Sequence, residues 1–163
     1  PSYNDFDIKL KQLENDIESL INNHTETELL AARSSFNNCY ESWQSIAMFN
    51  LRVAEQVSFA ALMNSYPAKV NDINQKIIDN ITEIGSYNIS KLGTTGFPAL
   101  SYLLYSNDNS LILSDITNSS NYNDYMRAIV SNMRINTDLI ISDWQNNRSD
   151  FVNSILSKLS AIS

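Results

Sequence analysis

The sequence has very few of the residues on which many functional sites depend. Its 163 residues include one cysteine, Cys39, and one histidine, His24. A single cysteine excludes a disulfide framework or a cysteine-based zinc cluster within one chain, and a single histidine excludes a multi-histidine metal site. From these absences we expect no resident cofactor and no metal ligands.

Basic residues are also scarce. The chain has 11 Lys and Arg against 18 Asp and Glu, which gives a formal net charge of −7. Because nucleic-acid-binding surfaces need clustered positive charge, nucleic acid is not an expected partner. No apolar run approaches the ~18–20 residues that span a bilayer, so no transmembrane segment is predicted.

Glycine and proline are rare, with three residues of each. Few turn-forming residues favour long helices over many short strands. A helical spacing of 4, 3, 4 and 3 runs through Phe6, Leu10, Leu13, Ile17 and Leu20. This spacing predicts a helix over residues 3–21 with one apolar face. Thr25 and Glu28 form a capping-box pattern that opens a second helix, which we expect to end near Asn50.

The rest of the chain predicts two more long helices and two short ones. One long helix is expected from Pro67, in its first turn, to Ile84, with Gly85 as the stop. The other starts at Tyr122 and continues to the C-terminus after a break at Asn146-Asn147. Residues 57–63 and 97–105 are the short helices, and residues 107–121 read as a loop. The predicted fold class is all-α: one antiparallel helical bundle over residues 1–163, with about four long helices and short connecting helices.

The residue types that carry catalysis elsewhere have structural interpretations here. Cys39 lies in the apolar stripe of the second helix, where a thiol packs as a small hydrophobic group. His24 lies at a helix boundary without a partner of metal-ligand spacing. The aromatic stripe of Phe36, Tyr40 and Trp43 has helical spacing, which is typical of a core. We therefore predict no catalytic residue.

One string, GTTGFPALSYLLY at residues 93–105, resembles the signature region of the imelysin-like family. Trp43 followed by an apolar stretch, and Tyr66-Pro67 leading into an Ile-rich helix, match the order of other family landmarks. Tyr125-Met126-Arg127-Ala128 leading to Trp144 resembles the closing helix of the family. The resemblance covers residues 25–145.

The resemblance implies an all-helical bacterial protein with two tandem bundles, of which this chain is similar to the first. It also implies export to the periplasm or attachment at the outer membrane, which is compatible with a lipid anchor in the full precursor. The family was named for a peptidase, and many members are associated with iron uptake. Its signature is Gly-x-His-x-x-Glu. Gly96 matches the glycine, whereas Pro98 stands in place of the histidine and Ser101 in place of the glutamate.

Those two replacements remove the side chains that could hold a metal. We therefore expect a non-enzymatic, imelysin-like cell-envelope domain with a binding or scaffold role linked to iron uptake. One alternative is half of a composite metal-dependent peptidase site, and another is an interaction module that docks a second imelysin-like bundle, in the same protein or another chain. Apolar residues outside the regular stripes are the predicted interface: Phe59, Leu62, Phe97, Tyr102 and Tyr105.

Overall fold

The computed structural model describes residues 3–48, 53–84 and 92–160, and every regular element in these ranges is an α-helix. The elements are α1 (Tyr3–Asn23), α2 (Glu26–Ile46), α3 (Val53–Gln56), α4 (Phe59–Asn64), α5 (Val70–Ile78), α6 (Gly96–Tyr105), α7 (Asn109–Asn118) and α8 (Ser120–Ser160). The all-α prediction is confirmed. The predicted end of the second helix at Asn50 and the predicted stop at Gly85 lie outside the described residues.

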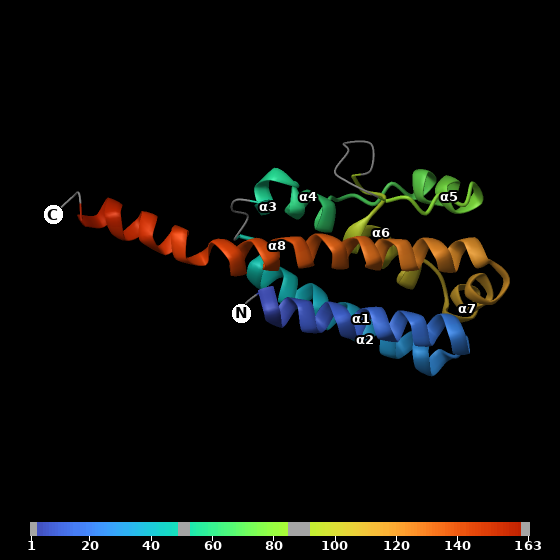
Figure 1. Ribbon diagram of the computed structural model, residues 1–163. Helices are drawn as coiled ribbons and strands as arrows, with labels where there is room; N and C mark the ends of the chain where they lie inside the picture. The colour runs from blue at the N-terminus through green and yellow to red at the C-terminus, as the bar shows by residue number, and fades with distance from the viewer. Residues whose placement is uncertain (1–2, 49–52, 85–91, 161–163) are drawn as a thin grey trace.

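Three long helices make the frame of the bundle. Helices α1 and α2 run side by side, and α8 packs along α1 (Figure 1). Short helices α3, α4 and α5 lie on the other side of α8, while α6 packs against α8 and α4. The C-terminal part of α8 continues beyond the other helices (Figure 1). Within the described ranges, no helix combines the length and the apolar character needed to cross a membrane.

The apolar stripe of α1 is buried as predicted, and the α2 start is also as predicted. Thr25 is the N-cap of α2, and its hydroxyl accepts a hydrogen bond of 3.5 Å from the Glu28 amide. His24 adopts a left-handed backbone conformation (φ 55°) immediately after α1, which ends that helix. Two aromatic side chains predicted for the core, Phe36 and Trp43, are buried.

Charged side chains join α1 to α8 along one seam. The Arg127 guanidinium donates to both carboxylate oxygens of Glu18, at 2.7 and 3.1 Å. Two turns further along α8, Arg134 pairs with Asp7 and lies 3.4 Å from a Glu14 oxygen. Because Arg134 and Asp7 are mostly buried, removing either partner would leave the other charge poorly solvated.

Helix α5 is shorter at both ends than the sequence predicted. It starts at Val70 instead of Pro67, because the Lys69 amide donates a 2.8 Å bond to the Gly93 carbonyl and the chain there follows the 92–95 loop. It ends at Ile78, where Asn80 takes a left-handed conformation and the Ile81 amide bonds back to Lys76 at 2.9 Å. This is a Schellman-type end with asparagine in the position that glycine usually takes.

Two predictions in the last third of the chain are wrong. Residues 109–118, expected to be a loop, form α7, which buries Ile112 and Ile116 one turn apart. The break at Asn146-Asn147 is absent, and α8 is continuous. The Asn147 amide group bonds back to the carbonyl of Asp143 at 3.1 Å and to its side chain at 2.8 Å, so this asparagine follows the helix instead of ending it.

Candidate functional site

Gly96, Pro98 and Ser101 are the positions matched to the family signature and are here called the motif-equivalent residues. They lie where the 92–95 loop enters α6. Gly93 (φ 80°) and Gly96 (φ 66°) both have left-handed backbone conformations that favour glycine. A Cβ atom on Gly96 would overlap the carbonyl oxygens of Leu62 and Met63, and one on Gly93 would lie 2.6 Å from the Pro67 carbonyl oxygen. The two glycines therefore let the loop pass directly over the end of α4 and the start of the 67–69 segment.

Pro98 and Ser101 occupy the first and second turns of α6, one turn apart. Pro98 is buried and Ser101 is half-buried. A proline is tolerated in the first turn because its missing N–H would have no partner within the helix. Neither residue can replace an imidazole or a carboxylate as a metal ligand, and no group of three or more His, Cys, Asp or Glu side chains within residues 3–48, 53–84 and 92–160 is arranged to hold a metal ion. At this turn, Pro98 and Ser101 therefore offer neither an imidazole nor a carboxylate.

Phe97 anchors the start of α6 in the centre of the bundle. The centroid of its ring lies 5.0 Å from that of Tyr40, 5.7 Å from that of Phe36 and 6.3 Å from that of Trp43. The Tyr40 and Phe36 contacts are edge-to-face, a favourable aromatic geometry. Phe97 itself is fully buried. The motif region thus enters the core through one aromatic side chain.

The C-terminal end of α6 is held by side chains from two other helices. The last carbonyl groups of a helix have no partner within it and need other donors. The Tyr122 hydroxyl donates to the Leu103 carbonyl at 2.5 Å, and the Arg33 Nε donates to the Leu104 carbonyl at 2.8 Å. The positive charge of Arg33 also lies at the favourable end of the helix dipole.

Arg33 is the centre of a wider polar network around Tyr105. Its guanidinium carbon lies 4.9 Å from the centroid of the Tyr105 ring, and the Tyr105 hydroxyl donates to the Arg33 carbonyl at 3.1 Å. Arg33 Nη1 also donates to the Asn109 side chain at 2.7 Å, and Asn109 donates to Glu26 at 2.6 Å. The network joins α2, α6 and α7 and explains how Tyr105 is held at the surface.

The five predicted interface residues fall into two groups by their exposure. Phe59, Leu62 and Phe97 are at most 2% exposed, so the expectation that they offer surface to a partner is wrong for these three. They close the core of this chain, because α4 and α6 pack against each other and against α8. Tyr102 is half-buried and Tyr105 is 41% exposed, and both remain available as contact residues.

Cys39 and His24 have different surroundings. Cys39 is fully buried, and burial raises the pKa of its thiol far above the usual value. Such a thiol is neither a nucleophile nor a metal ligand at neutral pH. His24 is exposed at the end of α1.

Burial also raises the pKa of Tyr125, to about 12, so this phenol stays protonated as a hydrogen-bond donor.

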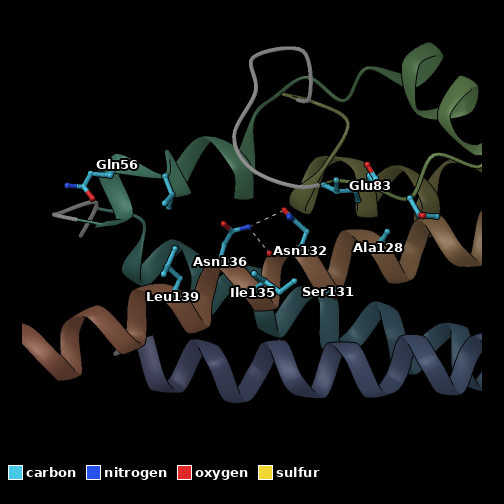
Figure 2. Close-up of a pocket in the computed structure, with 11 residues that line it drawn as sticks. Gln56, Glu83, Ala128, Ser131, Asn132, Ile135, Asn136 and Leu139 are labelled. Carbon is cyan, nitrogen blue, oxygen red and sulfur yellow. Dashed lines mark hydrogen bonds between the residues drawn. The ribbon is translucent and has the colours of Figure 1, made fainter.

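A groove of about 760 Å³ lies beside α8. Figure 2 shows it between α8 and the end of α3, with the segment after α5 at its edge. The lining residues, here called the α8 groove, are Gln56, Val57, Thr82, Glu83, Ile84, Ala128, Ser131, Asn132, Ile135, Asn136 and Leu139. Sequence reasoning missed this groove, as well as the roles of Arg33, Tyr122 and Tyr125. No local pattern marks residues that act across the bundle.

The comparisons with known proteins agree with the helical architecture. The family model described as Imelysin (Peptidase_M75) matches residues 1–162, and this chain therefore belongs to the imelysin family. No curated protein matches the chain. The crystal structure of a protein described as an iron-regulated protein A precursor, from Parabacteroides distasonis ATCC 8503, is similar in fold, with a TM-score of 0.75 and 18% sequence identity. The match covers 87% of this chain but only 40% of that protein.

Proposed function

We propose that this chain is a non-enzymatic binding or scaffold domain of the imelysin family, acting in the cell envelope in a system linked to iron uptake. The family match and the similarity to an iron-regulated precursor support the link to iron. The periplasm or the outer membrane is the proposed location. The proposed partner is a second imelysin-like bundle, because the match spans only 40% of that relative.

The observation that carries the non-enzymatic assignment is the state of the motif at the start of α6. Gly96 keeps the backbone turn, but Pro98 and Ser101 stand where the family signature has histidine and glutamate. A proline ring has no donor atom, and a neutral hydroxyl is a weak ligand for divalent transition metals. The turn is preserved as a structural feature, whereas the metal-binding side chains are replaced.

Metal analysis of the purified chain tests this assignment directly. After loading with Fe²⁺ or Zn²⁺ and dialysis, we expect far less than one metal per chain, and no metal-dependent cleavage of peptide substrates. The double variant Pro98→His/Ser101→Glu places the two family side chains one turn apart on α6, and it should retain more metal than the natural chain. One tightly held metal in the natural chain, with peptidase activity that follows it, would instead support half of a composite peptidase site.

A further inference from the structure

The α8 groove has an apolar floor that the described residues leave open. Ile135 is 64% exposed and Leu139 is 45% exposed, although both are large apolar residues on a long helix. They are four residues apart, so they lie on the same face of α8, one turn from each other. Figure 2 shows both beside the groove. Removing such side chains from water is favourable, so a partner that covers both residues gains binding free energy from their burial.

The edges of the groove are polar but carry little charge. Asn132 and Asn136 are mostly buried, and the Asn136 amide group bonds to the Asn132 carbonyl at 2.7 Å and to its side chain at 3.2 Å. Glu83 is the single ionised side chain among the described residues that line the groove. A partner that fits this chemistry is an amphipathic helix with apolar side chains at positions i and i+4 and a basic residue near Glu83.

We infer that the α8 groove is the docking site for a helix of a second helical unit. This unit is the counterpart of the part of the iron-regulated relative that lies outside the match, since the match covers 40% of that protein. The extension of α8 beyond the other helices in Figure 1 continues the same helix past the groove, which gives such a unit a long surface to pack against. The inference rests on the second-bundle partner of the proposed function. It also assigns the interface to α8 and α3 instead of to the buried Phe59, Leu62 and Phe97.

Thiol labelling can test the inference, because the natural cysteine is unreactive in the folded chain. Cys39 is fully buried and its thiol pKa is raised, so it does not react in the folded chain at pH 8. An Ile135→Cys variant then carries one reactive thiol, in the groove. The matched control is Ile8→Cys, since Ile8 is 62% exposed on α1. A maleimide reagent should label both variants at similar rates in the 163-residue chain.

The decisive comparison uses the same variants in the protein expressed from its natural gene in its native host. There, we expect labelling of Ile135→Cys to slow by about tenfold or more, while labelling of Ile8→Cys is unchanged. Adding Leu139→Glu should restore the fast labelling, because a carboxylate in the apolar floor opposes docking. Equal labelling in both preparations would overturn the inference, as would protection of Ile135→Cys in the 163-residue chain alone. Neither readout depends on metal content, so the result is separate from the test of the non-enzymatic assignment.

Discussion

The phenolic hydroxyl of Tyr125 donates a hydrogen bond of 2.5 Å to the carbonyl oxygen of Thr94. The two residues belong to the longest helix and to the glycine-containing loop before α6, and both are buried. The bond therefore joins the entrance of α6 to the frame of the bundle. Together with Gly93 and Gly96, it positions the motif-equivalent residues.

Removing this bond should lower stability without disturbing the packing. In Tyr125→Phe the buried ring is retained, and we expect a loss of about 1 kcal/mol in the free energy of unfolding, typical of one buried hydrogen bond. Urea denaturation followed by circular dichroism measures the change. Tyr122→Phe, which removes the bond to Leu103, is the matched comparison and should lose a similar amount. A variant as stable as the natural protein would show that the Tyr125 bond contributes nothing.

Gly96→Ala should be much more damaging. The new Cβ would overlap the carbonyl oxygens at the end of α4, and the residue would have to keep a left-handed conformation. We expect a loss of more than about 3 kcal/mol, or failure to fold. The control is Ser101→Ala on the same helix, which should change stability by less than about 0.5 kcal/mol. An unchanged thermal midpoint in Gly96→Ala would contradict the close approach of the loop to α4.

Replacement of Arg33 tests how α6 is held at its C-terminal end. Arg33→Met keeps the aliphatic stem but loses the bonds to Leu104 and Asn109 and the contact with the Tyr105 ring. Hydrogen bonds to charged groups contribute about 1.5–3 kcal/mol, so we expect a loss of about 2 kcal/mol. Arg33→Lys keeps the charge but not the fork of donors, and its stability should fall between those of Arg33→Met and the natural protein. A lysine variant equal to the natural protein would mean that charge alone is sufficient.

The Asp7–Arg134 seam should make stability depend on pH in the acid range. Burial alone would raise the pKa of Asp7, but hydrogen bonds and charge from Lys11 and Arg134 outweigh it and hold the pKa below its usual value. The stabilisation is therefore complete above the unfolded-state pKa of about 3.9 and is lost as the pH falls through the lower, folded-state pKa. Urea unfolding at pH 7, 5 and 3 measures this loss.

Variants of the seam identify its cause. Asp7→Asn should be less stable than the natural protein at pH 7 and should lose less stability on acidification. Arg134→Gln should move the acid transition to higher pH, because it removes one of the two cations that hold the Asp7 carboxylate ionised. If Asp7→Asn and the natural protein lose stability in parallel down to pH 3, Asp7 is not the group that titrates.

The sequence predicts α1 and α2 well because their apolar stripes are uninterrupted. Phe6, Leu10 and Leu13 continue a pattern that no strand could bury on one face, and Thr25 marks the next helix by a local hydrogen bond. Helix α7 is different. Its two buried residues, Ile112 and Ile116, stand among Asn, Ser and Asp, and its helical state depends on packing against α2 and α8.

Helix ends show the same limit. Asparagine and glycine both adopt left-handed conformations, so spacing alone does not decide whether Asn80 or Gly85 ends α5. Asn80 ends it, because the segment that follows turns away toward the α8 groove, which Thr82 and Ile84 help to line. The reverse occurs in α8, where Asn147 has the character of a helix breaker and instead bonds back to Asp143 within the helix.

The candidate site can be located from the sequence, but the residues that hold it in place cannot. Gly96, Pro98 and Ser101 form a local string that can be compared with a family signature. Arg33 and Tyr122 act on α6 from 71 residues before and 19 residues after their acceptors, and nothing near either residue indicates this role. The open side of the bundle escapes prediction for a related reason. Apolar segments outside the regular stripes suggest an interface, whereas Ile135 lies in the long helix predicted from Tyr122 onward and is exposed.

The contacts that cap α6 also set the order in which the chain can fold during its synthesis. When the ribosome has added Tyr105, α6 is complete in sequence, but Tyr122, which caps the Leu103 carbonyl, has not yet been made. The contact of α6 with Arg33 closes a loop of 71 residues, a costly step that is favourable only when other contacts form with it. Helices α1 and α2, adjacent in sequence, can pair on the emerging chain. The motif region is completed only when α8 emerges, so in a nascent chain stopped before Tyr122 the apolar residues of α6 lack their packing against that helix.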